Sequence, residues 1–182
     1  LIGGEPFMNK EIYEIIDFFL INTKISKIVV YTNGTIPLKD ERLKNYNKSK
    51  LVFTITDYGN LSKNTDKVYD ALINNNVPTR LHPPENWTDS GVIQDFKRTE
   101  VEMKELFDIC CGKNLFTSMN GKLYRCPFAA NAESLKGIPT DEKNSVPINS
   151  SPEMIEKYTR DIEFIPACNY CKGRSFDAAE IV

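Results

Sequence analysis

The pattern of apolar and polar residues in the first half of the chain switches between two forms. Continuous apolar runs are typical of buried strands, and apolar residues spaced three or four apart are typical of helices. Unbroken β-branched and aromatic runs are typical of strands buried on both faces of a parallel sheet. Such runs occupy residues 28–31 and 51–56, and residues 1–2 and 77–81 are expected to be the tail of a strand and a further short strand. Between them, apolar side chains recur every three or four residues over 12–20 and 68–72, as on one face of an amphipathic helix. Strands separated by helices imply right-handed crossovers, so we expect an α/β fold with a parallel sheet.

After Pro84 this alternation stops, and the irregular residues 87–96 indicate a domain boundary. Thr99 and Glu102 have the spacing of a capping box, so a helix is expected to begin there and to lead into the cysteine-rich part of the chain. The expected divisions are a sheet domain at 1–86, a linker and helix at 87–110, and a small cysteine-rich domain at 111–182.

Two polar stretches in the second half of the chain predict different structures, one a loop and the other a helix. Residues 129–150 contain Pro139 and Pro147 and are predicted to form a long surface loop. Ser151-Pro152-Glu153 supplies a cap, a first-turn proline and a first-turn acid, so a short helix is expected to follow it.

Composition narrows the class of protein. The chain has 182 residues, of which 41% are hydrophobic and 26% charged, as in ordinary globular domains. A net charge of −2 with dispersed Lys and Arg argues against a nucleic-acid partner. Acidic residues interrupt the apolar runs, so we expect no membrane span, no secretory signal and a cytoplasmic location. The chain begins at Leu1 without an initiator Met, and we expect it to be a piece of a longer protein.

All five cysteines lie in the second half of the chain, and their number and spacing indicate a metal centre. An odd number late in the sequence disfavours a secreted disulfide scaffold and favours reduced thiols. Asn120-Gly121 predicts a hairpin turn that would return Cys126 toward the first cysteines. Two thiols separated by two residues can face one centre from a single tight turn. The predicted ligands of one iron–sulfur site are Cys111, Cys126, Cys168 and Cys171, with Cys110 as the alternative.

Three loops that follow predicted strands combine Gly with a polar side chain. They are Gly3-Gly4-Glu5-Pro6, Thr32-Asn33-Gly34 and Asp57-Tyr58-Gly59. In parallel sheets, chemistry gathers at the carboxyl ends of the strands, where such loops bring backbone close to a small ligand. The alternative is that each loop is simply a turn.

With these positions established, the chain resembles the radical S-adenosylmethionine enzymes that carry a C-terminal SPASM or twitch auxiliary-cluster domain. Gly3-Gly4-Glu5-Pro6 is similar to the family's GGEP motif, and Thr32-Asn33-Gly34 to its TNG motif. Cys111-x9-Gly121-x4-Cys126 and the later Cys168-x2-Cys171 are similar to the auxiliary-domain cysteines. The SPASM pattern continues with three more cysteines, and none follows Cys171 here. The resemblance is therefore to the twitch variant with one auxiliary 4Fe–4S cluster, or to a SPASM domain cut short.

The resemblance implies a partial TIM-like βα barrel whose strand ends hold S-adenosylmethionine. The residues it implies in cofactor binding are Gly3, Gly4, Glu5, Pro6, Asn33, Thr54 or Thr56, Asp57 and Arg80. The family's CxxxCxxC motif, which holds a second 4Fe–4S cluster, is absent from this sequence and would lie upstream of Leu1. The parent is thus expected to cleave S-adenosylmethionine reductively and to modify a peptide, protein side chain or amino sugar, with a reductant protein as partner. This fragment itself is expected to be inactive.

Three other expectations accompany this one. Four cysteines can instead hold structural zinc in a binding or interaction domain without catalysis, particularly in protein purified in air. An inert α/β domain with coincidental cysteines is the third alternative. Loss of the first barrel strands would also leave an open sheet edge, through which the fragment is expected to self-associate.

Overall fold

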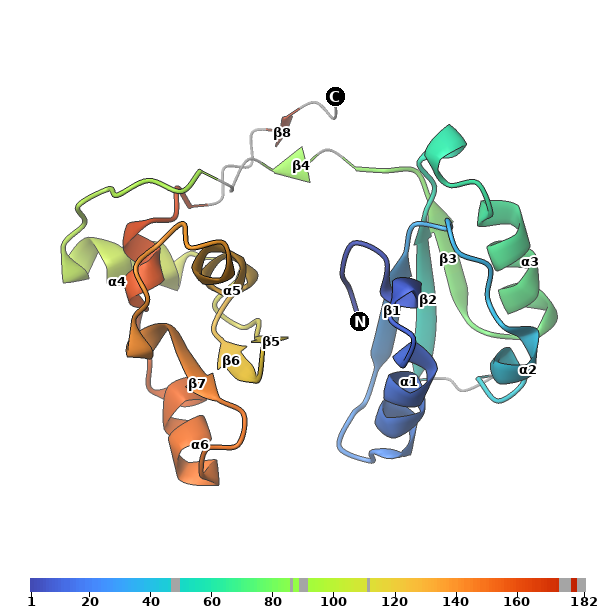
Figure 1. The fold of residues 1–182 in the computed structure, drawn as a ribbon, viewed down its shortest axis with the longest axis horizontal. Helices are drawn as coiled ribbons and strands as arrows, with labels where there is room; N and C mark the ends of the chain where they lie inside the picture. Colours follow the sequence, from blue (N-terminus) through green and yellow to red (C-terminus); the bar gives the residue numbers. More distant parts are fainter. Residues whose placement is uncertain (47–49, 86, 89–91, 111, 174–177, 180–182) are drawn as a thin grey trace. The chain divides into compact units, whose positions relative to one another are not determined.

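The chain forms two compact units, Leu1–Glu85 and Asn86–Val182, which are described separately below. The structure is a computed structural model that describes residues 1–46, 50–85, 87–88, 92–110, 112–173 and 178–179. Within these ranges, the fold is α/β: a three-stranded parallel sheet with helices, followed by a three-stranded antiparallel sheet with helices (Figure 1). The described strands form no closed barrel.

The first unit is built on a parallel sheet in the order β1-β2-β3. Its strands are β1 (Ile28–Thr32), β2 (Leu51–Thr56) and β3 (Thr79–His82). Its helices are α1 (Ile12–Ile21), α2 (Asp40–Leu43) and α3 (Thr65–Asn74), with 3-10 turns η1 (Pro6–Met8) and η2 (Gly59–Leu61). The register places Tyr31 opposite Thr54, and Thr54 opposite Arg80. The predicted alternation of strands and helices is confirmed.

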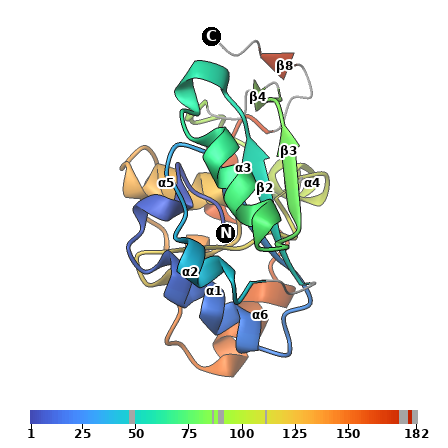
Figure 2. The same cartoon turned by 90° about the vertical axis from the view of Figure 1, so that its right-hand side faces the viewer.

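Helices α1, α2 and α3 lie on one face of this sheet, as Figure 2 shows. Alternate strand side chains such as Val30, Phe53 and Ile55 are fully buried and form the core with Ile16 of α1 and Leu72 of α3. The intervening strand positions point to the opposite face. No described helix of this unit covers that face, on which Tyr31 and Arg80 are exposed whereas Thr54 is buried, and it is the face that a barrel would enclose.

Leu1 makes the backbone hydrogen bonds of a parallel strand pair with β1. Its amino group donates to the Val29 carbonyl (2.6 Å), and the Tyr31 N–H donates to the Leu1 carbonyl (3.0 Å). These bonds are as expected for the end of a strand beside β1. Leu1 therefore already pairs with part of the β1 edge, so this edge is not fully open to another strand.

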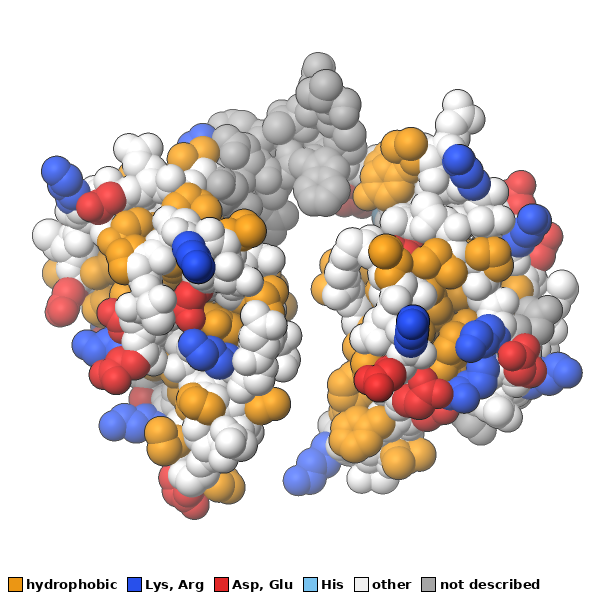
Figure 3. All heavy atoms as spheres, in the orientation of Figure 1, with side chains coloured by type: hydrophobic (Ala, Val, Ile, Leu, Met, Phe, Trp, Pro, Cys, Tyr) orange, Lys and Arg blue, Asp and Glu red, His pale blue; other side chains and the backbone are white. Residues whose placement is uncertain are grey.

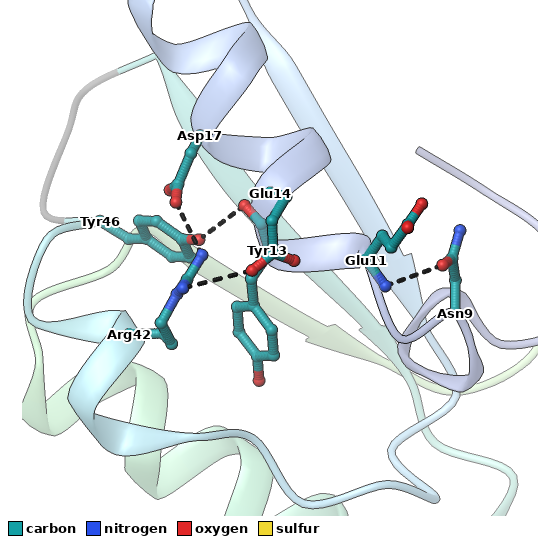
Figure 4. Close-up of polar contacts among 7 residues, drawn as sticks. All are labelled: Asn9, Glu11, Tyr13, Glu14, Asp17, Arg42 and Tyr46. Carbon is teal, nitrogen blue, oxygen red and sulfur yellow. Dashed lines mark hydrogen bonds and ion pairs between the residues drawn. The ribbon is translucent and has the colours of Figure 1, made fainter.

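The short helix α2 is attached to α1 by charged and aromatic side chains (Figure 4). The Arg42 guanidinium contacts Asp17 Oδ2 at 2.7 Å and Glu14 Oε1 at 3.4 Å. The buried Tyr46 donates its hydroxyl to the Tyr13 carbonyl at 3.3 Å. These contacts hold the crossover between β1 and β2 against α1.

The second unit has an antiparallel sheet in the order β5-β6-β7. Its strands are β5 (Thr117–Met119), β6 (Lys122–Tyr124) and β7 (Ser145–Pro147). Helices α4 (Glu100–Asp108), α5 (Pro127–Ser134) and α6 (Pro152–Arg160) surround it, with 3-10 turns η3 (Glu142–Asn144) and η4 (Pro166–Asn169). A separate two-residue pair joins β4 (Trp87–Thr88) to β8 (Ala178–Ala179).

Local signals predicted most elements of this unit. Asn120 and Gly121 have φ of 50° and 72°, as a type I′ turn requires, and they connect β5 to β6. Thr99 and Glu102 form the expected capping box at the start of α4, and Ser151 caps α6 as expected. These predictions are confirmed.

The predicted surface loop at 129–150 is wrong. It contains most of α5, the η3 turn and strand β7, and Ala129, Ala130 and Val146 are buried. Pro127 sits at the first helical turn, where its fixed φ favours a helix, and the alanines that follow are strong helix formers. Strand β7 pairs with β6, and the two strands are too far apart in sequence for a local pattern to predict their pairing.

Figure 3 shows one face of the molecule, on which basic and acidic side chains are interspersed in both units. Among the described residues, the helices are all too short or too polar to cross a bilayer.

Candidate metal centre and strand-end loops

Four of the cysteines that the structure describes in the second unit line one cavity of about 730 Å³. They are Cys110, Cys126, Cys168 and Cys171. Much of the rest of the wall is apolar and includes Leu106, Phe107, Leu115, Phe128 and Ile165. Side chains from the end of α4, the start of α5 and the η4 turn are thus brought together by tertiary packing.

Backbone N–H groups point at three of these sulfurs. Gly112 donates to Cys110 Sγ at 3.2 Å, and Gly173 donates to Cys171 Sγ at 3.3 Å. Cys126 caps α5, and its Sγ accepts the Ala129 N–H at 3.3 Å. Donors aimed at sulfur stabilise its negatively charged form, and such bonds also tune iron–sulfur centres.

Burial acts in the opposite direction on two of the thiols. It raises the pKa of Cys126 from an ordinary value of 9.0 to about 11, partly offset by the Ala129 N–H. It raises the pKa of Cys168 from 9.0 to about 12. Negative charge on the neighbouring cysteines raises both pKa values further. Both thiols are therefore protonated at neutral pH until a cation replaces their protons.

The described residues contain no group of three or more His, Cys, Asp or Glu side chains arranged to hold a metal ion. The four thiols share a cavity without converging on one point. Of the predicted ligands, the structure brings Cys126, Cys168 and Cys171 to this cavity together with the alternative, Cys110. Cys111 lies outside the described residues.

Arg98 holds the turn that carries Cys168 and Cys171, and sequence reasoning missed it. Its Nη1 donates to the carbonyl oxygens of both cysteines, each at 2.7 Å. Its backbone N–H donates to Asn169 Oδ1 at 2.7 Å, and Phe96 N–H donates to the Asn169 carbonyl at 3.1 Å. The partners are about seventy residues apart in sequence, so no local pattern would have indicated them.

In the first unit, Glu5 joins the Gly3-Gly4-Glu5-Pro6 loop to the end of β1. Its Oε2 accepts the Thr32 hydroxyl and the Asn33 N–H, both at 2.8 Å, and its Oε1 accepts the Phe7 N–H at 3.1 Å. Glu5 is only 8% exposed. Protein donors occupy both carboxylate oxygens, so the side chain holds the loop in place.

The backbone of that loop remains open. A Cβ added at Gly3 or Gly4 would meet no atom within 4 Å, and both residues are exposed. Asn33 Nδ2 lies 3.4 Å from the Gly4 carbonyl oxygen. Packing within this unit therefore does not explain the two glycines. Pro6, by contrast, is buried as the first residue of η1.

The other residues predicted to bind the cofactor lie toward the carboxyl ends of the strands, but their side chains do not all face one point. Thr54, Thr56 and Arg80 share the helix-free face, since Thr54 is in register with Arg80. Thr54 is buried, whereas Arg80 is exposed. Thr56 Oγ1 lies 3.4 Å from His82 Nε2. Asp57 accepts the Gly59 N–H at 2.8 Å, which forms the turn after β2.

No protein-family model matches the sequence, and no curated protein matches it either. The function is therefore inferred from the cysteine cavity and the strand-end loops.

Proposed function

We propose that this chain is the C-terminal part of a radical S-adenosylmethionine enzyme and that its second unit holds one auxiliary 4Fe–4S cluster. The observation that carries the proposal is the cavity shared by four thiols from three separate segments. We propose Cys110, Cys126, Cys168 and Cys171 as the ligands.

The chemistry of the donor set fits a cluster. All four donors are sulfur, the ligand type that iron–sulfur clusters use. The walls are largely apolar, and backbone N–H groups already point at Cys110, Cys126 and Cys171. When bound and fully ligated by thiolates, such a cluster can accept and pass on single electrons. It would then have no vacant iron for a substrate, so its role would be electron transfer or support of the fold.

Structural zinc in a non-catalytic domain is the second candidate, because an all-thiolate set also suits Zn²⁺. A tetrahedral zinc site needs all four sulfurs about 2.3 Å from one point. The described thiols do not converge in this way. A cluster places several irons between its ligands, so it does not require its four sulfurs to meet at one point.

We further propose that the strand ends of the first unit hold S-adenosylmethionine as part of an incomplete βα barrel. The open backbone of Gly3 and Gly4 and the accessible face with Thr56 and Arg80 support this. Glu5 would act by holding the loop, since its oxygens are occupied by protein donors. Reductive cleavage would need a CxxxCxxC motif, which this sequence does not contain. The substrate would be a peptide, protein side chain or amino sugar, with a reductant protein as electron source.

Anaerobic reconstitution with iron and sulfide, followed by metal and acid-labile sulfide analysis, tests the cluster. We expect equal amounts of bound iron and sulfide, and a loss of both in Cys126→Ala and Cys171→Ala. Stoichiometric zinc without sulfide in anaerobically purified protein would favour the second candidate. Metal content and stability unchanged in both variants would indicate an inert domain.

A further inference from the structure

The hydroxyl of Tyr158 bridges two backbone segments of the second unit. It accepts the Arg125 N–H at 3.1 Å and donates to the Asn144 carbonyl at 2.5 Å. Tyr158 is 7% exposed and Asn144 only 1%. Because the bridge is buried, loss of the hydroxyl would leave both backbone groups without a hydrogen-bond partner, which is costly in a protein interior.

The bridge lies where the β6-β7 ladder ends. That ladder pairs Tyr124 with Ser145, so Arg125 and Asn144 are the next residues that would stand opposite each other. The tyrosine hydroxyl of α6 connects these two residues in place of a direct backbone contact. Cys126 follows immediately and is the N-cap of α5. The hydroxyl therefore holds the backbone at the point where it leaves the sheet and presents this cysteine.

The side chain of Asn144 continues the connection to a second cysteine segment. Its Oδ1 accepts the Ala167 N–H at 2.9 Å. Ala167 precedes Cys168 in the η4 turn, just as Arg125 precedes Cys126 at the start of α5. Three hydrogen bonds thus join the residues directly before two cysteines that line the same cavity.

Packing alone does not account for an asparagine at this position. Asn144 Nδ2 is buried and has no hydrogen-bond partner among the described residues. A buried donor without a partner costs free energy that an apolar side chain would avoid. What an asparagine offers in return is the Oδ1 acceptor for the Ala167 N–H.

Tyr158 remains a hydrogen-bond donor at neutral pH. Burial raises the pKa of its hydroxyl above the ordinary value of 10.0, partly offset by the hydrogen bond from the Arg125 N–H. Negative charge on Cys126 raises this pKa further, so the tyrosine and this thiol are near enough to interact. The bridge therefore keeps its proton whether the cysteine is charged or neutral.

We propose that Tyr158 and Asn144 are positioning residues that fix the spacing between Cys126 and Cys168 in the cavity. Neither side chain is proposed as a ligand. The functional meaning of the inference rests on the proposed thiolate centre, because such a centre forms only when the segments that carry its ligands keep their separation. The connection itself needs no metal, so the two proposals can be tested apart.

Amide hydrogen exchange, followed by nuclear magnetic resonance on the full-length chain purified without iron, tests the connection. Tyr158→Phe removes only the bridging hydroxyl. Tyr124→Phe is the matched control, because Tyr124 is 4% exposed and its hydroxyl bonds to Glu133 Oε1 at 3.2 Å instead. We expect the Arg125 and Ala167 amides to exchange about tenfold faster in Tyr158→Phe and at native rates in the control.

The Ala167 amide decides this experiment, because it donates to Asn144 and not to Tyr158. Faster exchange there requires that loss of the hydroxyl be transmitted through Asn144. Asn144→Ala should in turn speed the exchange of the Arg125 amide, and it supplies the test if Tyr158→Phe does not fold. Native exchange at the distant amide in a folded variant would overturn the inference, and so would equal acceleration in the control.

Metal retention tests the consequence for the centre. After anaerobic reconstitution with iron and sulfide, Tyr158→Phe and Asn144→Ala should hold the metal about 10- to 100-fold more weakly against a chelator. Tyr124→Phe should stay near the native value. Equal weakening in all three variants would indicate a general loss of stability and would overturn the positioning role. A native chain that binds neither iron nor zinc refutes the proposed centre, whereas the exchange experiment still decides whether the two segments are coupled.

Discussion

The Thr32 hydroxyl donates a 2.8 Å hydrogen bond to Glu5 Oε2, which joins the loop after Leu1 to the end of the first strand. The same oxygen accepts the Asn33 N–H, and the other oxygen accepts the Phe7 N–H. Glu5, which its motif indicated for cofactor contact, therefore binds protein donors with both carboxylate oxygens and fixes its own loop. The backbone around it is what remains available to a ligand.

Glu5→Gln should destabilise the first unit by about 1–3 kcal/mol, because its amide nitrogen cannot accept the bonds that the carboxylate accepts. Thr32→Val should cost a similar amount, because Glu5 Oε2 loses one of its donors and the Gly34 N–H loses its acceptor. Urea unfolding followed by circular dichroism measures both. Glu11→Gln, at an exposed position, is the control and should be close to neutral. Equal midpoints for all three variants would contradict a structural role for Glu5.

Arg98→Met should release the turn that carries Cys168 and Cys171, since both carbonyls lose their donor. We expect metal or cluster affinity to fall about 10- to 100-fold, as for other residues that support metal ligands. Chelator challenge of the loaded chain measures this loss. Arg160→Met serves as the exposed control. A variant that retains its metal as long as the native chain would show that the turn holds its shape without Arg98.

Cys110→Ala should reduce bound iron and sulfide as strongly as Cys126→Ala, because both sulfurs line the same cavity. With Cys110 as the fourth ligand, Cys111→Ala should leave the metal content near the native level, and the structure does not describe the place of Cys111. Parallel reconstitution and elemental analysis of the three variants distinguish them. The reverse pattern, with loss only in Cys111→Ala, would make Cys111 the ligand instead.

The metal-free chain should lose stability in alkaline solution. Burial raises the pKa of Cys126 to about 11 and that of Cys168 to about 12, from 9.0 in both cases. The unfolded chain therefore releases these protons first, and the free energy of unfolding should fall as pH rises from about 9 through 12. Urea titrations under reducing conditions measure the slope. A Cys126→Ala, Cys168→Ala chain should have a shallower slope, and an identical slope would show that other groups cause it.

Self-association through the sheet of the first unit should be weak and concentration-dependent. Leu1 already occupies part of the β1 edge, which leaves fewer backbone groups for a second copy. Sedimentation velocity over a wide concentration range tests this prediction. A single monomer boundary at every concentration would exclude it.

Sequence reasoning succeeded where the deciding contacts are local. The capping box joins residues three positions apart, and the turn at Asn120 and Gly121 depends on two backbone angles. It failed at 129–150, where β7 gains its partners only by pairing with β6. The roles of Glu5 and Arg98 were also beyond it, since their partners are distant in the chain.

By itself, the sequence determined the order of strands and helices, the hairpin and the supply of sulfur donors, because periodicity, turn chemistry and residue type act over a few neighbours. Only the tertiary structure decided that Cys110, Cys126, Cys168 and Cys171 share a cavity and that Glu5 is occupied by protein donors. It alone revealed that Tyr158 and Asn144 connect the residues that precede Cys126 and Cys168. Burial and pairing depend on which distant segments pack together, and no local pattern specifies that packing.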